Sequence, residues 1–242
     1  MRNISSIIIG LAFIIGLFIV GNAYKSRSKA METITVTGSA EKDFISDLIV
    51  WNGSYSRKSM DLKSAYAQLK DDENAIKSYL ISKGVQSNEI VISAININKE
   101  FNFKTDENGR SIGQEFSGYN LTQNVKIESS NVDKINQISR EATELIEKGI
   151  EFNSSSPLFY YTKLTEVKMD LLAKASADGK IRADIIAKNA GSSLGKLMKA
   201  TSGIFQITGK NSNEDYSYGG TFNTTSRNKT GSITIRMEFS VD

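Results

Sequence analysis

The stretch TITVTGSAEKDFISDLIVWNGSY, residues 33–55, changes its hydrophobic pattern partway along. Ile34 and Val36 alternate with threonines, which is the period-two pattern of a strand with one buried face. After GSAEKD both faces carry apolar side chains, namely Phe44, Leu48 and Val50 on one and Ile45, Ile49, Trp51 and Tyr55 on the other. A strand that is apolar on both faces needs cover on both sides. The stretch therefore predicts two strands, and it raises the question of what covers the second face.

Gly38 is the flexible point that we expect between these two strands. One face of the second strand is predicted to pack under helices of the same chain. The other face would be covered by a second sheet or by a neighbouring subunit. Trp51 and Tyr55 are accordingly predicted either as core residues or as contacts between subunits, because an open strand edge invites pairing between copies.

The composition excludes most kinds of active site. The 242-residue chain contains no Cys and no His. Thiol nucleophiles, disulfides, zinc sites built on Cys or His and His-dependent triads are therefore impossible. An enzyme would have to rely on carboxylates, Lys, Tyr or an oxygen-ligated cation. We therefore predict a protein that is not an enzyme and that needs no cofactor or metal.

The formal charge of +3 comes from the first thirty residues. Arg2, Lys25, Arg27 and Lys29 are the only charged side chains before residue 31, and removing them from 30 basic residues leaves 26 against 27 acidic ones. A body that is nearly neutral argues against nucleic acid as a partner.

Residues 4–24 contain no charged side chain and are dense in Ile, Leu, Phe and Val. At about 1.5 Å per residue such a helix would span roughly 30 Å, the thickness of a bilayer core. The predicted membrane-spanning residues are Ile7, Ile8, Ile9, Leu11, Phe13, Ile14, Ile15, Leu17, Phe18, Ile19 and Val20. The segment 1–30 is either a retained anchor or a signal cleaved after Ala23, since GNA offers small residues there. Residues 31–242 are predicted as one α+β domain.

The remaining pattern predicts strands in hairpins separated by helices. Expected helices cover 59–84, 131–149 and 165–190, with Gly84 and Gly149 ending the first two. Expected strands follow at 89–103, with an irregularity near Ala94, at 116–129, at 150–164, at 194–210 and at 231–241. Pro157 should interrupt the strand at 150–164. The order ββαββαβαββ predicts an α+β fold with helices packed on a mainly antiparallel sheet.

One side of the helix at 165–190 is lined mainly by small residues, which predicts a close neighbour. These residues are Leu172, Ala175, Gly179, Ala183, Ile186 and Ala190.

Four stretches of the body resemble the SIMPL domain family of bacterial periplasmic and envelope proteins. They are ITVTGSAEKDFISDLIVW, LISKGVQSNEIVIS, FSGYNLTQNVKIE, and AKASADGKIRADIIAKNAGSSLGKLMKATSG with the closing SITIRMEFSV. The resemblance covers about residues 32–242 and implies a mixed α+β fold, export across the inner membrane and self-assembly. Some members are described as outer-membrane immunogenic or oxidative-stress defence proteins, and one relative forms a hollow, ring-like oligomer. No catalytic residues are established in the family, so the resemblance assigns none.

Four short motifs contain residue types that could bind a ligand or carry out a reaction. SLGK at 193–196 fits the S-x-x-K pattern of acyl transfer but lacks companion motifs. DENG at 106–109 has its glycine at the wrong position for a calcium loop. DDE at 71–73 is interpreted as a solvated helix face. YSYGG at 216–220, with Phe222, is either a flexible linker or a loop tip that contacts a ligand or partner.

These observations favour an envelope protein that forms homo-oligomers and has a structural or stress-protective role. It would be anchored in the inner membrane with its domain in the periplasm, or secreted to the periplasm if cleaved. The alternative is a ligand-binding module in which the loop at 209–230 recognises an envelope component. A third possibility is an enzyme based on carboxylates or Lys.

Overall fold

The computed structural model describes residues 10–11, 13–21, 32–107 and 110–241. Residues 10–11 and 13–21 are helical, and the large apolar side chains described there are exposed. Within the described residues no helix is long and apolar enough to cross a membrane. Ile7, Ile8 and Ile9 of the predicted span lie outside the described residues. The anchor therefore stays a prediction.

Strands from the N-terminal and C-terminal parts of the body form one antiparallel sheet. We call this sheet, together with the helix that packs on it, the terminal lobe. It contains β1 (Thr33–Ile45), β8 (Leu194–Ser202), β9 (Gln206–Gly209) and β10 (Asn228–Val241). The order is β1-β10-β8, and β9 pairs with the other end of β10. The helix α4 (Leu164–Asn189) packs on one face of this sheet.

The chain between these parts builds a second antiparallel sheet, and we call residues 48–160 the inserted lobe. Its strands are β2 (Leu48–Ser59), β3 (Ile90–Ile92), β4 (Asn96–Thr105), β5 (Ser111–Ser129), β6 (Phe152–Ser154) and β7 (Leu158–Tyr160). The order is β3-β5-β2-β6, with β4 also on β5 and β7 also on β2. The lobe's helices are α2 (Leu62–Ser82) and α3 (Val132–Glu141), with short 3-10 turns η1 (Ser87–Glu89) and η2 (Ala142–Lys148).

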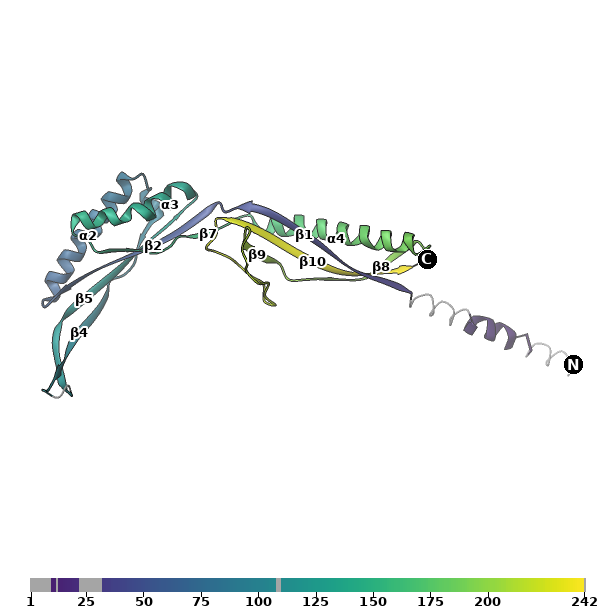
Figure 1. Ribbon diagram of the computed structural model, residues 1–242, viewed down its shortest axis with the longest axis horizontal. Helices are drawn as coiled ribbons and strands as arrows, with labels where there is room; N and C mark the ends of the chain where they lie inside the picture. The colour runs from purple at the N-terminus through teal and green to yellow at the C-terminus, as the bar shows by residue number, and fades with distance from the viewer. Residues whose placement is uncertain (1–9, 12, 22–31, 108–109, 242) are drawn as a thin grey trace.

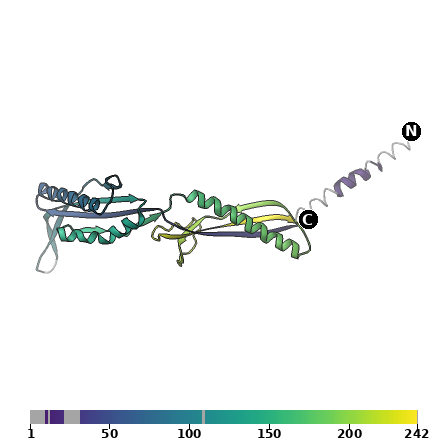
Figure 2. The same cartoon turned by 90° about the horizontal axis from the view of Figure 1, so that it is seen from above.

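The two lobes lie end to end and make an elongated, bent molecule (Figures 1 and 2). The end of the hairpin formed by β4 and β5 projects away from the rest of the inserted lobe. In the terminal lobe α4 lies on one side of the sheet and the segment between β9 and β10 on the other. Each lobe has its own cluster of buried apolar residues.

The predicted α+β class and element order are confirmed. Three predicted strands are each divided in two: 89–103 into β3 and β4, 150–164 into β6 and β7, and 194–210 into β8 and β9. The first break includes Ala94 and the second includes Pro157, where the sequence places an irregularity and a proline.

The buried residues of the stretch 44–55 belong to different cores. Phe44, at the end of β1, is buried with α4 in the terminal lobe. Ile49, Trp51 and Tyr55, on one face of β2, are buried in the inserted lobe. Leu48 and Val50, on the other face of β2, are half-buried, and Ile45 at the end of β1 is exposed. The chain leaves one sheet and enters the other at residues 46–47, so Phe44 does not form one continuous face with Leu48 and Val50.

Trp51 and Tyr55 are therefore core residues of their own lobe, with 0% and 2% of their surface exposed. The helices α2 and α3 cover this part of β2. Their burial supports the core alternative, and the alternative that these two side chains contact a neighbouring subunit stays a prediction that gains no support from their exposed surface. The period-two pattern predicts that these two side chains are buried, but it does not predict which elements cover them.

Gly38 is not a flexible point between strands, because β1 runs through it without a break to Ile45. A Cβ at Gly38 would lie 2.1 Å from the carbonyl oxygen of Ala175 and 2.5 Å from the amide nitrogen of Gly179. The glycine is needed because α4 rests directly on the backbone of the strand. The close neighbour that the small residues of this helix predict is β1.

Candidate functional site

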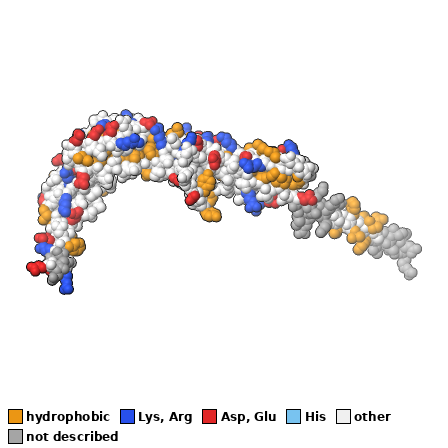
Figure 3. All heavy atoms as spheres, in the orientation of Figure 1, with side chains coloured by type: hydrophobic (Ala, Val, Ile, Leu, Met, Phe, Trp, Pro, Cys, Tyr) orange, Lys and Arg blue, Asp and Glu red, His pale blue; other side chains and the backbone are white. Residues whose placement is uncertain are grey.

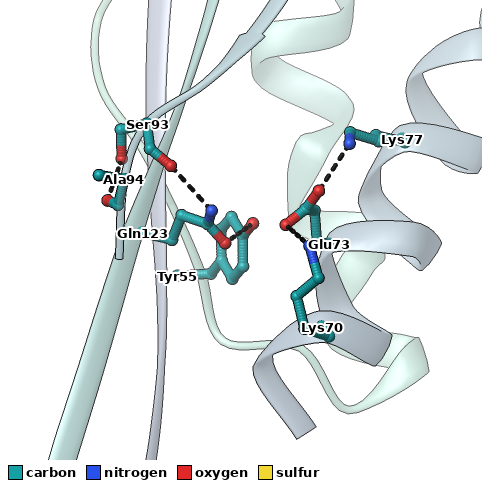
Figure 4. A network of polar contacts seen from close by, with 7 residues as sticks. All are labelled: Tyr55, Lys70, Glu73, Lys77, Ser93, Ala94 and Gln123. Carbon is teal, nitrogen blue, oxygen red and sulfur yellow. Dashed lines mark hydrogen bonds and ion pairs between the residues drawn. The ribbon is translucent and has the colours of Figure 1, made fainter. Parts of the chain in front are cut away.

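A buried polar network occupies the middle of the inserted lobe (Figure 4). The Tyr55 hydroxyl donates to Gln123 Oε1 (2.8 Å), and Gln123 Nε2 donates to the carbonyl oxygen of Ser93 (2.8 Å). These bonds hold the segment that connects β3 to β4. Burial, with the nearby charge of Glu73, raises the pKa of Tyr55, so the hydroxyl stays protonated. The network is a structural support and offers no base.

The acidic run at 71–73 is not a solvated face. Asp72 and Glu73 are buried, and both carboxylates are paired. Arg57 holds Asp72 through two hydrogen bonds, while Lys70 and Lys77 hold Glu73. Hydrogen bonds from the two lysines lower the pKa of Glu73. These carboxylates are therefore occupied, and the described residues contain no group of acidic side chains suited to a metal ion.

The other two motifs gain no support as sites. Lys196 of SLGK lies exposed on β8, and the described residues bring no further motif to it. Half of DENG, residues 108–109, lies outside the described residues.

The segment 210–227, which we call the tyrosine loop, is folded against β9 by one buried side chain. Gln206 Oε1 accepts from the backbone N–H of Thr221 (2.6 Å) and of Ser217 (3.4 Å), and its Nε2 donates to the carbonyl of Ser217 (2.9 Å). Backbone bonds join Ile207 to Thr221 and Asn223. The loop therefore has a defined conformation. This conformation is expected of an ordered loop tip and not of a flexible linker.

The base of the tyrosine loop is fixed by a buried lysine. Lys229 Nζ donates to the carbonyl oxygen of Asn223 (2.5 Å), and its side chain is almost fully buried. Burial lowers the pKa of Lys229 to about 8. The Glu214 carboxylate accepts from the N–H of Gly209 (2.9 Å) and from the Asn223 amide, and these bonds lower its pKa.

A cavity of about 410 Å³ lies between the tyrosine loop and the sheet. Its lining residues are Ile204, Gln206, Tyr216, Ser217, Tyr218, Ser232, Ile233 and Thr234. Ser232 Oγ donates to the Tyr216 hydroxyl (3.2 Å), which fixes this ring at the wall of the cavity. Figure 3 shows apolar side chains at the projection formed here, on the side of the sheet opposite α4. A volume of this size suits a small ligand.

The hairpin of β4 and β5, which we call the arm, has one apolar and one polar face. Phe101 lies opposite Phe116 in the register, and Lys99 lies opposite Tyr119, so these side chains share a face. The ring of Phe116 lies 5.8 Å from Phe101 and 5.1 Å from Tyr119. Phe103, on the same face, is 70% exposed. The other face carries Asn98, Glu100, Asn102, Lys104, Glu115 and Asn120.

The tyrosine loop also joins the two lobes. The Phe159 N–H donates to the carbonyl of Thr224 (2.7 Å), and the Arg227 guanidinium makes a bidentate ion pair with Asp133 on α3. The rings of Tyr160 and Phe222 lie 6.5 Å apart. The loop therefore touches the inserted lobe at one end and closes the cavity at the other.

Two antiparallel sheets, each with its own helical cover and core, define a two-lobed α+β protein, and its candidate sites are an arm and a loop-lined cavity. The model of the SIMPL family, described as a protein of unknown function (DUF541), matches residues 34–241. The match spans both lobes, so the chain belongs to the SIMPL family. A comparison with curated proteins gave no match.

Sequence reasoning missed the arm as a candidate site. The signal was present, because Ile97, Phe101 and Phe103 alternate with polar residues in NINKEFNF. The pattern was interpreted as an ordinary half-buried strand, whereas the structure leaves its apolar face without cover in the described part of the chain.

Proposed function

We propose that this SIMPL protein is a non-catalytic component of the bacterial cell envelope that assembles with copies of itself through the arm. The observation that carries the proposal is the exposed apolar face of a two-stranded ribbon. The role would be structural or stress-protective, with the segment 1–30 as the membrane anchor or signal. The composition without Cys and His, and the paired carboxylates at 72–73, support a role other than catalysis.

The apolar face of the arm continues the core face of the inserted lobe. Leu121 on β5 is fully buried in that core, and Ile97 lies opposite it in the register. Farther along, the same face carries Phe101, Phe116 and Phe103, and the Phe101 and Phe103 side chains are 49% and 70% exposed. The face therefore begins under cover and ends exposed, which is the pattern of a surface completed by another chain.

A second copy of the arm is the partner that fits this face. Two-stranded ribbons are marginally stable alone, and two of them packed face to face bury both apolar surfaces. Each copy presents the same face, so the contact is self-complementary. Burying one Phe side chain contributes about 1.5–3 kcal/mol, so a few such side chains from each copy are sufficient to matter.

The test is the molar mass of the full chain in a mild detergent, measured by light scattering after size exclusion. We expect a defined mass of two chains, because a single self-complementary face closes with two copies. Phe103→Lys should reduce the mass toward one chain without changing thermal unfolding, because the side chain is exposed. Met169→Lys, at a similarly exposed apolar position on α4, is the matched control and should keep the mass. A monomeric wild-type chain, or an unchanged mass in Phe103→Lys, would contradict the proposal.

The cavity under the tyrosine loop favours the second candidate function, a ligand-binding module. It does not compete with the first, because the arm and the cavity lie on different lobes.

A further inference from the structure

We propose that the cavity under the tyrosine loop is a binding site for a neutral saccharide. The site is built by a folded loop, an aromatic pair and the hydroxyl-bearing face of the terminal sheet. This inference goes beyond self-assembly through the arm and stands or falls separately from it.

The lining of the cavity is uncharged. None of its eight residues is Lys, Arg, Asp or Glu. A charged ligand, such as a phosphate-bearing headgroup, would lose its hydration on entering and would meet no counter-charge on the lining. A neutral ligand avoids this cost.

The loop presents aromatic rings as a recognition surface. Tyr218 is 100% exposed although the loop that carries it is held by Gln206, Lys229 and Glu214. Tyr216 is more than half exposed and is fixed through its hydroxyl by Ser232. Tyr216 is thus held at its ring, and Tyr218 is carried on a backbone that the loop contacts hold in place. Tyrosines among Ser, Gly and Asn supply a large contact area at small entropic cost. The electron-rich ring faces suit the polarised C–H faces of a sugar ring.

Hydroxyl groups supply the polar half of the site. Ser217, Ser232 and Thr234 each combine one donor with acceptor lone pairs, which matches the groups of a sugar. Within the described residues the Thr234 hydroxyl has no hydrogen-bond partner, and it faces the side of the sheet opposite α4. Ser232 Oγ already donates to Tyr216 and Ser217 Oγ accepts from the N–H of Gly219 (3.2 Å), so these two hydroxyls offer their remaining hydrogen-bonding capacity and Thr234 offers all of its own. Aromatic rings beside such hydroxyls favour a saccharide over a purely apolar ligand, which would leave the Thr234 hydroxyl unpaired.

The experiment uses the full chain in a zwitterionic detergent, because a sugar headgroup would compete for the site. The neutral probes are maltotetraose, cellotetraose and chitotetraose, and the charged probes are tetragalacturonic acid and glycerol phosphate, the soluble headgroup of phosphatidylglycerol. Binding is measured by isothermal titration and by ligand-observed NMR. We expect saturable binding of at least one neutral probe and none of the charged ones.

Two variants test the assigned contacts. Tyr218→Ala should weaken binding about tenfold or more, and it cannot disturb the core because the side chain is fully exposed. Thr234→Val, which keeps the shape, should weaken binding about two- to tenfold. Tyr66→Ala, at an exposed tyrosine on α2, is the matched control and should bind as the wild type does.

Absence of binding to every neutral probe, preference for a charged probe, or unchanged binding in Tyr218→Ala would each overturn the proposal. None of these outcomes bears on the oligomeric state, which is read from the molar mass. The two proposals therefore fail separately.

Discussion

The two lobes solve the same packing problem in different ways. In the inserted lobe, large side chains fill the space between sheet and helices: Trp51, Tyr55 and Phe152 are all buried there. In the terminal lobe a single helix lies so close to the sheet that Gly38 and Gly179 face each other. Large side chains fill both cores, but the second also requires glycines where α4 comes closest to β1.

The difference also decides where surface is left for other molecules. One helix covers only one face of the terminal sheet, so the opposite face is free for the tyrosine loop and its cavity. In the inserted lobe the helices cover the sheet but not the arm beyond it. Both candidate sites therefore lie on parts of a sheet that no helix of the same lobe covers.

The largest effect is expected from a charge placed in the inserted core. Tyr55→Lys should destabilise the protein by more than about 4 kcal/mol, because it removes a buried aromatic ring and places an ammonium group in the core. Chemical denaturation followed by circular dichroism measures the loss. Retention of the fold with a smaller oligomer would instead restore Tyr55 as a contact between subunits.

A methyl group at the helix–sheet contact should show how rigid the terminal core is. Gly38→Ala is expected to cost about 3 kcal/mol or more, because the new Cβ meets backbone atoms of α4 that cannot move alone. The matched change in the other lobe, Gly53→Ala, meets the Phe152 ring, which can shift, and should cost about 1–2 kcal/mol. Equal losses of unfolding free energy, measured in urea, would show that the two cores accommodate an added methyl group equally well.

The buried lysine of the terminal lobe predicts a specific pH dependence. Lys229 has a pKa of about 8 in the folded chain against 10.5 for an ordinary lysine. The unfolded chain therefore binds more protons between about pH 8 and 10.5, and the stability contributed at this residue rises with pH through that window. The gain is at most about 3 kcal/mol, since one pKa unit corresponds to about 1.4 kcal/mol.

Urea midpoints of the wild type and of Lys229→Met, measured from pH 7 to pH 10, isolate this contribution. The difference between the two proteins should change in favour of the wild type as the pH rises. A difference that stays constant would mean that Lys229 titrates as an exposed lysine.

The smallest effect is expected at the joint between the lobes. Asp133→Asn removes the charge that pairs with Arg227, and because Asp133 is largely exposed while Arg227 is only partly buried, stability should fall only slightly. Arg227 lowers the pKa of Asp133, and the contribution is therefore present above the ordinary pKa of an Asp and lost in acid. Spin labels on the two lobes should report a broader distance distribution in the variant. An unchanged distribution would assign the joint to the backbone contacts alone.

Local features of the fold could be predicted from the sequence. Gly84 and Gly149 end their helices with positive φ, and Pro157 divides its strand, because these effects depend on the residue itself. The pattern also gave the buried positions of β2. It could not give the division into two cores, because periodicity shows that Phe44 and Trp51 are buried but not that they are buried in different places.

The candidate sites were predictable only in part. The aromatic loop stood out in the sequence, but its order depends on Gln206, whose hydrogen bonds reach residues 11 and 15 positions away. The role of Gly38 depends on a helix more than a hundred residues later. Long-range contacts of this kind leave no periodic signal.

The pairing of β1 with β10 sets an order of events during synthesis. Thr33 pairs with Ser240, so the first strand of the body waits for the last one. At about 5–20 residues per second, roughly 10–40 s pass before β10 leaves the ribosome. The inserted lobe is complete long before then, whereas β1 remains an unpaired apolar strand next to a finished domain. In the nascent chain the backbone of residues 33–45 therefore stays without its strand partner, and Val36 and Phe44 stay without their core, until the final strand arrives.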